Sequence, residues 1–219
     1  MVAAAGLIVL VLLAWTLVGY LSTRGIETPE YEVIRRAPGY EVRAYAPYIR
    51  AEVRVTGTYE AALNRGFRRV AGYIFGGNKA GADVAMTSPV LSEKAGDSGQ
   101  TIAMTAPVLH EGGKEEHTHI IAFVMPVEYT MATLPEPNDA DVTLVQVPAR
   151  RYAVVKFLGY ARARRVAKKT AALEAALARD GVEATGPAIV AQYDPPWTPP
   201  CMRQNEIWIA IQEEPKDSA

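Results

Sequence analysis

The sequence predicts an α+β fold in which two amphipathic helices cover one sheet, preceded by a single transmembrane helix. Three observations lead to this prediction: an uncharged apolar run at the N-terminus, two helical stripes set among strand patterns, and a constant spacing between the two halves of the chain. The 219 residues, 49% of them hydrophobic, are enough for one buried core.

The N-terminal run Val2–Leu21 carries no charged side chain. At about 1.5 Å per residue, roughly 20 residues cover the ~30 Å hydrocarbon core of a bilayer. No Lys or Arg precedes the run and no small-x-small cleavage site follows it, which favours a retained anchor over a cleaved signal peptide. We therefore expect a single-pass anchor over residues 1–21 and a polar linker over residues 22–30. The few arginines that follow leave the side of the membrane open.

Two stripes of side chains recur with helical spacing, one in each half of the chain. The stripes are Leu63, Phe67, Val70 and Ile74 in the first half and Val166, Thr170, Leu173 and Leu177 in the second. The first predicted helix ends at Gly76-Gly77, a common terminator. Pro47 matches Pro148 and Gly57 matches Gly159, at offsets of 101 and 102 residues. This spacing predicts an internal duplication.

Strand patterns surround both helices. Alternating residues over 31–55, with a turn at Pro38-Gly39, predict the first strands, and further strands are expected after each helix. The later strands are predicted over Val84–Leu91, Ile102–Met125, Ala188–Tyr193 and Glu206–Gln212. The unit is thus strand, helix, strand, strand, used twice within residues 31–213, and a polar tail follows over 214–219. Each helix must cover a shared sheet, which leaves a cleft between helix and sheet for a ligand.

The phrase M-T-x-P-V occurs twice, as Met86–Val90 and Met104–Val108. The two copies predict the arms of a long hairpin, in which Pro89 and Pro107 mark edges or bulges. Both methionines would supply adaptable apolar surface there. Closure of a sheet edge and contact with a ligand are equally open roles for this repeat.

The composition excludes several classes of function. With 23 basic and 24 acidic side chains, a net charge of -1 provides no general basic surface, so nucleic acid is not an expected partner. The single cysteine, Cys201, rules out an intramolecular disulfide and is expected to be a free buried thiol. Neither a G-x-S-x-G elbow nor a phosphate-binding glycine loop is present, which favours a binding protein over an enzyme.

The phrases "YEVRAYAPYIRAEV", "MTSPV", "MTAPV" and "AQYDPPWTPPCMRQNEIWIAI" resemble the SOUL haem-binding proteins, and the resemblance runs from Tyr31 to Gln212. It implies a distorted antiparallel β-barrel flanked by two helices and formed by duplication. This architecture is similar to the small-molecule-binding domains of bacterial multidrug-sensing regulators. The resemblance also implies non-covalent binding of haem or another tetrapyrrole by a carrier, buffer or sensor.

The resemblance places the ligand against the first helix. The implied contacts are Leu63, Asn64, Phe67, Arg68 and Ala71, with Trp197 on a late loop. Guanidinium groups pair well with propionates, and the cations near this site are Arg65, Arg68, Arg69 and Arg203. At this spacing Phe67 is more often a core residue, and exposed arginines on a helix are usually a solvated face. Some members carry an iron-ligating histidine where this chain has Ala44, so no axial ligand is implied from that position.

Three histidines lie close together in the sequence. His117 and His119 are two residues apart on a predicted strand, and His110 lies across the Gly112-Gly113 turn from them. Their convergence predicts either ligation of a metal or haem iron, or a solvated hairpin tip.

Two alternative functions follow from the C-terminal phrase "QNEIW". A binding module for amphipathic or cationic small molecules would need a buried acid in its cleft, and Glu206 is the candidate. Pairing of Glu206 with Arg203 is the competing role. A weak hydrolase would use Glu206 or Tyr193.

Overall fold

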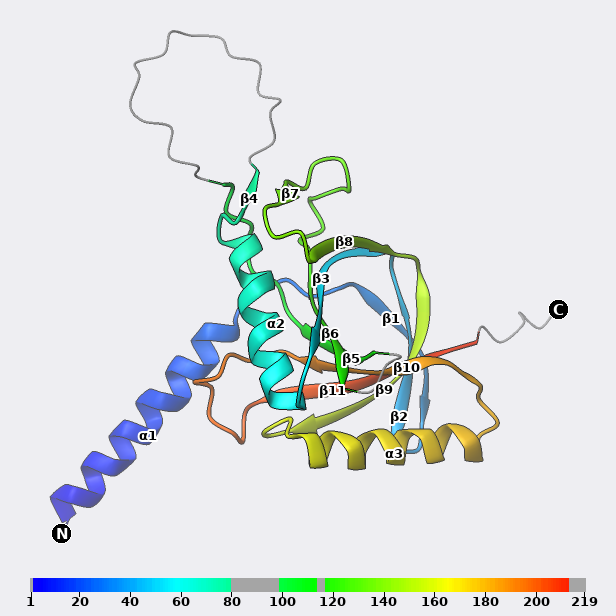
Figure 1. Cartoon of the computed structure of the whole chain (residues 1–219). Coiled ribbons are helices and arrows are strands. Elements are labelled where there is room, and N and C mark those ends of the chain that lie inside the picture. The colour runs from blue at the N-terminus through cyan, green and yellow to red at the C-terminus, as the bar shows by residue number, and fades with distance from the viewer. Residues whose placement is uncertain (1, 80–98, 114–116, 213–219) are drawn as a thin grey trace, which may run out of the picture.

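A computed structural model describes residues 2–79, 99–113 and 117–212 (Figure 1). Nine antiparallel strands form one sheet that curls into a half-barrel, with the order β1-β2-β9-β11-β10-β5-β6-β3-β8. The strands are β1 (Tyr31–Ala37), β2 (Tyr40–Tyr45), β3 (Tyr48–Thr56), β5 (Val108–Gly112), β6 (Thr118–Val124), β8 (Val142–Val147), β9 (Arg150–Leu158), β10 (Ala184–Gln192) and β11 (Gln204–Ile211). The short strands β4 (Asn78–Lys79) and β7 (Glu136–Pro137) form a separate pair.

Three helices accompany the sheet in the described ranges: α1 (Val2–Thr23), α2 (Tyr59–Ile74) and α3 (Ala163–Arg179). The predicted α+β class, with two helices against one antiparallel sheet, is therefore confirmed. The central six strands, in the order β9-β11-β10-β5-β6-β3, have the same arrangement in both halves. In each half a strand (β3 or β9) leads into a helix, and two antiparallel strands (β5-β6 or β10-β11) follow the helix. The connecting glycines Gly57 and Gly159 both have positive φ, 134° and 98°, a region that favours glycine.

The central strands of the sheet are buried on both faces. On the outer face, α2 packs over β3 and β6 while α3 packs over β9, β10 and β11. On the inner face a third cluster, which includes Tyr45, Tyr152 and Trp208, fills the half-barrel. Strand β11 therefore runs almost entirely buried. Two-sided burial explains why its sequence, "NEIWIAI", shows little polar alternation.

The predicted helical stripes face this core. Val70, Ile74, Leu173 and Leu177 are buried, and Leu63, Phe67 and Val166 are half-buried against the same clusters. Helix α2 approaches β6 closely at Gly66, where a Cβ would lie 2.4 Å from Cγ1 of Ile121. Glycine is required there because any side chain would collide with the strand.

Several expectations from the sequence are corrected. Residues 102–125 form no single strand: β5 and β6 make a hairpin, and residues 102–107 precede it outside any strand. The backbone N–H of Ala106 donates instead to the carbonyl of Glu27, and Pro107 has no N–H to offer a ladder. The first M-T-x-P-V copy lies outside the described residues. Strand β8 was not predicted, and Cys201 is exposed because it lies in a surface turn.

Helix α1 projects from the domain and carries exposed apolar side chains (Figure 1). Its last turns contact the loop before β11: the indole N–H of Trp15 donates to the carbonyl of Trp197 at 2.7 Å, and Trp197 donates to Oγ of Ser22 at 3.2 Å. Gly19 is buried against Pro199, whose Cδ would lie 2.6 Å from an added Cβ. No membrane-spanning helix is identified among the residues that the structure describes.

Candidate ligand-binding site

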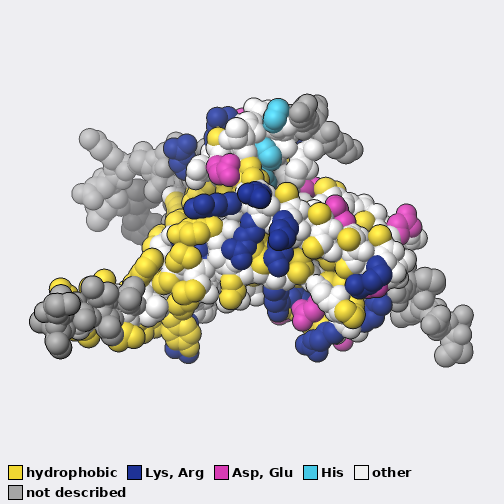
Figure 2. All heavy atoms as spheres, turned by 90° about the horizontal axis from the view of Figure 1, so that it is seen from below, with side chains coloured by type: hydrophobic (Ala, Val, Ile, Leu, Met, Phe, Trp, Pro, Cys, Tyr) yellow, Lys and Arg dark blue, Asp and Glu magenta, His cyan; other side chains and the backbone are white. Residues whose placement is uncertain are grey.

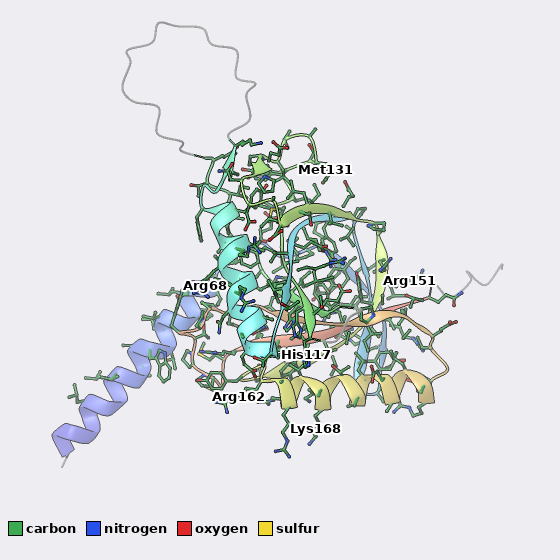
Figure 3. The ribbon with its side chains drawn as sticks, in the orientation of Figure 1. Arg68, His117, Met131, Arg151, Arg162 and Lys168 are labelled. Atoms are coloured by element: carbon green, nitrogen blue, oxygen red, sulfur yellow. The ribbon has the colours of Figure 1, made fainter. Side chains whose placement is uncertain are left out.

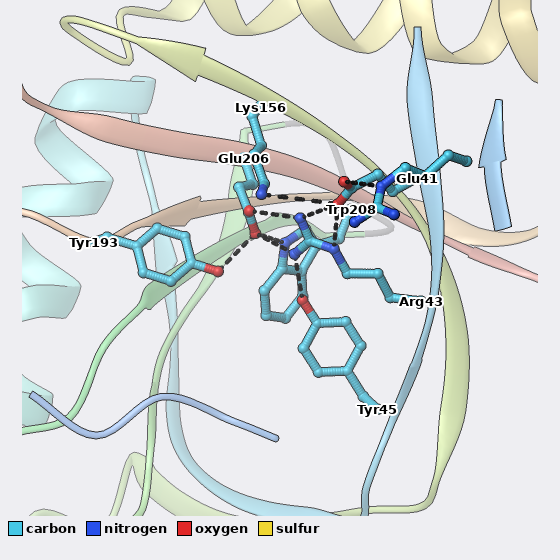
Figure 4. A network of polar contacts seen from close by, with 8 residues as sticks. Glu41, Arg43, Tyr45, Lys156, Tyr193, Glu206 and Trp208 are labelled. Carbon is cyan, nitrogen blue, oxygen red and sulfur yellow. Dashed lines mark hydrogen bonds and ion pairs between the residues drawn. The ribbon is translucent and has the colours of Figure 1, made fainter. Parts of the chain in front are cut away.

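A fully buried cation, the guanidinium of Arg43, lies on the inner face of the half-barrel (Figure 4). Arg43 on β2 donates through Nη2 and Nη1 to the two carboxylate oxygens of Glu206 on β11, at 3.0 and 3.2 Å. Its Nε and Nη2 also donate to Glu41, at 3.0 and 2.8 Å. Burial alone lowers the pKa of Arg43, but its hydrogen bonds with Glu206 and Glu41 outweigh burial and hold the pKa above its usual range. Arg43 therefore stays charged.

The Glu206 carboxylate is fully engaged. Besides Arg43, it accepts hydrogen bonds from the Tyr193 hydroxyl at 2.6 Å and the Trp208 indole N–H at 2.7 Å. Burial, and then the negative charge of Glu206, raise the pKa of Tyr193 above its ordinary value, so the phenol remains a donor. A carboxylate with these partners does not offer an open acid to an incoming cation.

This network corrects the role expected for Glu206. Its partner is Arg43, whereas Arg203 donates from Nε to the carbonyl of Thr198 at 2.8 Å. No sequence signal identified Arg43, because a single arginine in the strand phrase "YEVRAY" reads as an outward residue. The register places Arg43 opposite Tyr152 of β9, on the inner face.

Two cavities of about 300 Å³ each open on either side of the linker that follows α1. Both include Thr28 and Pro29 in their walls. The apolar cavity is lined chiefly by Tyr48, Ile49, Val124, Met125, Pro126 and Met131. The polar cavity is lined by Tyr31, Lys156, Tyr193, Asp194, Gln204 and Glu206. Their volumes lie at the lower end of the ~300–1,000 Å³ range of ligand pockets.

The second M-T-x-P-V copy separates these cavities. Thr105 lines the apolar cavity and Ala106 the polar one. The segment also anchors the linker, because Ala106 N–H donates to the Glu27 carbonyl at 2.9 Å, while the Glu27 side chain accepts from Val127 N–H at 2.6 Å. The repeat phrase therefore lines cavity walls and binds the linker, whereas the edge strands of the sheet are β1 and β8.

The residues predicted on α2 divide between two faces. Asn64 and Arg68 are exposed, whereas Leu63 and Phe67 pack inward and Ala71 is buried. The Phe67 ring lies 5.2 Å from that of Phe123, centroid to centroid. Trp197 is 56% exposed and contacts α1. Neither of the two cavities takes a wall residue from α2, and neither does a third cavity of about 150 Å³ lined by Lys156, Phe157 and Glu206.

The nearby cations differ in availability. Arg69 is held by Asp139 and Asp141, with two contacts of 2.6 Å, so it is not free to bind a propionate. Arg65 donates to the carbonyl of Thr56 at 3.2 Å. Arg68 forms no ion pair with any residue that the structure describes, and Figure 3 shows it on α2.

Two of the three histidines meet. His110 Nε2 lies 3.0 Å from His119 Nδ1, and His119 Nε2 lies 3.1 Å from the Gly57 carbonyl. A carbonyl only accepts, so His119 carries its proton on Nε2 and accepts from His110. His117 occupies the turn, at φ 61°. His110 is buried, so the predicted solvated hairpin tip is wrong for this residue. Ligation of a metal or of haem iron by these histidines stays a prediction.

The fold is a curled antiparallel half-barrel covered by two helices. Cavities large enough for a ligand lie beside the linker that follows α1. Residues 26–210 match the family described as "SOUL heme-binding protein", and the chain belongs to this family. Heme-binding protein 2 of Homo sapiens is 26% identical over 200 residues, which cover 89% of this chain and 90% of that protein.

Solved structures share the fold at low identity. The crystal structure of the EcmrR C-terminal domain gives a TM-score of 0.53 at 12% identity, covering 84% of this chain and 99% of that one. EcmrR in a cryo-EM structure of its DNA complex gives 0.55 at 11% identity, covering 80% of this chain and 57% of that one. These similarities establish the architecture alone.

Replacing Glu206 with Gln tests the buried ion pair. The change keeps the shape of the side chain but leaves the buried charge of Arg43 with Glu41 as its remaining carboxylate. We expect the free energy of unfolding to fall by roughly 3–5 kcal/mol, measured by denaturant titration. The matched Asp141→Asn change, at an exposed carboxylate paired with Arg69, should cost about 0–1 kcal/mol. Equal losses for both variants would contradict the importance of the buried pair.

We expect His110 to make the free energy of unfolding depend on pH. Burial, and then the neighbouring His119, lower the pKa of His110 from 6.5 to about 4. Between these values the unfolded chain binds a proton that the folded chain excludes, so the contribution is fully present above pH 6.5 and is lost as pH falls towards 4. The loss should approach about 3 kcal/mol. His110→Gln should flatten the measured profile in this window, and an unchanged slope would refute the assignment.

Proposed function

We propose that this protein binds haem or a related tetrapyrrole non-covalently, as a carrier, buffer or sensor tethered to a membrane. The observation that carries the proposal is membership of the SOUL heme-binding protein family over residues 26–210. The relative in Homo sapiens is named Heme-binding protein 2 and aligns over 89% of this chain, which supports the same ligand class.

The outward face of α2 fits such a ligand. Asn64, Arg68, Gly72 and Phe75 are exposed and succeed one another at spacings of four, four and three residues. An added Cβ at Gly72 would meet nothing within 4 Å, and Phe75 is 60% exposed, so the face is open and partly apolar. Arg68 can pair with a propionate because its guanidinium forms no ion pair with a carboxylate in the described part of the chain. The inward residues Leu63, Phe67 and Ala71 would support this face from the core.

Bound haem would supply its iron for redox or gas-binding chemistry, while the protein's residues hold the ring and its propionates. No axial ligand is assigned. Position 44 is alanine, and the imidazole nitrogens that join His110 and His119 already face each other. The two linker cavities, at about 300 Å³ each, are small for a whole tetrapyrrole, which further favours the open face of α2.

A cationic small molecule is a weaker alternative. It would require a free buried acid, and the Glu206 carboxylate already binds Arg43, Tyr193 and Trp208. The polar cavity retains Asp194, whose pKa is raised by burial, as its remaining candidate acid.

Haemin titration followed at the Soret band tests the ligand assignment. Arg68→Glu should weaken haemin binding by about tenfold, equivalent to ~1.4 kcal/mol, because a propionate would meet a carboxylate. Arg151→Glu makes the same charge change far from α2 and should leave binding unchanged (Figure 3). Absence of saturable binding by the unmodified chain would overturn the function, and equal effects of both variants would overturn the site.

We also propose that residues 2–21 anchor the chain in a membrane as a single pass. The segment has no charged residue, and Leu10, Leu13 and Leu17 of α1 are each more than half exposed, which leaves apolar surface for lipid.

A pair of substitutions tests the anchor. Leu10→Arg with Leu13→Arg should move the chain from the carbonate-resistant membrane fraction to the soluble fraction, since each arginine costs roughly 2.5–3.5 kcal/mol within a span. The control is Ile34→Arg with Leu158→Arg, at exposed apolar sites outside α1, which should leave the distribution unchanged. A chain that is soluble without any substitution would refute the anchor.

The two halves of the domain are further proposed to derive from a duplication. The matching strand order, the offsets of 101 and 102 residues and the positive φ of Gly57 and Gly159 support this origin. Superposition of β3–α2–β5–β6 on β9–α3–β10–β11 tests it, and a failure of the units to align in that register would refute it.

A further inference from the structure

The first half of α3 and the residue before it carry a cluster of cations that the tetrapyrrole site does not use. We define the basic face as Arg162, Arg164, Arg165, Lys168 and Lys169. No Asp or Glu occurs between residues 159 and 173. Without these five cations the chain has 18 basic and 24 acidic side chains, so the basic face is a local concentration of positive charge on an otherwise acidic protein.

The five cations of the basic face form no ion pair within the part of the chain that the structure describes. Arg162 and Arg165 lie near aromatic rings, of Tyr160 and Phe157, while Lys168 points away from the sheet into solvent (Figure 3). Cations in the first turns of a helix also oppose its dipole, so their placement costs stability instead of adding to it. A partner outside the chain would account for them.

The basic face lies on the same side of the molecule as the apolar helix α1. Figure 2 shows Lys and Arg side chains gathered beside the hydrophobic helix on this side. The loop before β11 joins the two, because Trp197 contacts Trp15 and Ser22 of α1 while Arg203 stacks 4.4 Å above the Tyr160 ring. Exposed Trp197 and Tyr160 therefore lie between lipid-compatible and cationic surface. Exposed aromatic residues at such a boundary are typical of membrane interfaces.

We propose that the basic face docks on a bilayer that contains anionic lipids, with Trp197 in the headgroup region. The inference rests on the proposed anchor, since α1 brings this side of the domain to the membrane. Anionic headgroups complement the unpaired cations, and each Lys or Arg near such a surface contributes about a fivefold gain in binding. Docking would fix the tilt of the domain relative to the bilayer.

The chain contains its own reporter for this contact. Cys201 is the single cysteine, is exposed, and lies in the same loop as Trp197. A polarity-sensitive fluorophore on Cys201 of the full chain would shift to the blue when the loop enters the headgroup region. Flotation with phosphatidylcholine vesicles, with and without phosphatidylglycerol, reports the anchor separately from the fluorophore.

We expect the chain to float with both kinds of vesicle, and the fluorophore to shift only when phosphatidylglycerol is present. The shift should vanish at about 1 M salt, where the screening length is ~3 Å, while flotation persists. Lys168→Glu with Lys169→Glu should reduce the ratio of docked to undocked chains by at least about thirtyfold. Arg150→Glu with Arg151→Glu, an equal charge change at the start of β9, should leave the shift intact.

Several outcomes would overturn docking. An equal shift with neutral vesicles, or no shift in a chain that floats, refutes the basic face and leaves the anchor standing. Flotation only with anionic vesicles, lost in Lys168→Glu with Lys169→Glu, supports docking and refutes the anchor. No flotation with either vesicle refutes both. A shift of the same size with double-stranded DNA would identify a general polyanion site and overturn the bilayer as the occupant.

Discussion

The buried charge of Arg43 constrains the whole inner face of the half-barrel. A guanidinium fully removed from water is tolerated only where carboxylates reach it, and these come from Glu41 on its own strand and Glu206 on β11. Strands β2 and β11 are not neighbours, since β9 lies between them. The ion pair therefore spans three strands and fixes the curl of the sheet at this point.

The same ion pair determines what the interior can bind. Because Arg43, Tyr193 and Trp208 all donate to Glu206, its carboxylate is not available to a ligand. The linker separates the space beside the inner face into two small cavities. The outer face is covered by α2 and α3. A whole tetrapyrrole is large for either cavity, which is consistent with the proposed site on the outward stripe of α2 around Arg68.

The sequence predicted the elements whose periodicity is strong. Both helices followed from stripes such as Val70 with Ile74 and Leu173 with Leu177, which are buried as expected. Arg43 was missed because alternation cannot tell which polar residue of a strand turns inward when both faces are buried. The segment before β5 was predicted to be a strand because it is apolar. It pairs with no strand, and its Ala106 N–H donates to the carbonyl of Glu27 in the linker instead. For the site, Leu63 and Phe67 already belonged to the core stripe, so their inward orientation was implicit in the periodicity.

The proposed anchor would strengthen the proposed binding of the basic face to the membrane. A free protein with five surface cations binds an anionic membrane weakly, because association costs translational freedom and salt screens each charge. For a chain already held by α1, docking becomes intramolecular, and the effective concentration of lipid at the basic face is high. Modest attraction per charge is then sufficient to orient the domain. Orientation matters for a tetrapyrrole, an amphipathic ligand that partitions into bilayers, because it determines whether the exposed stripe of α2 faces the lipid source or the solvent.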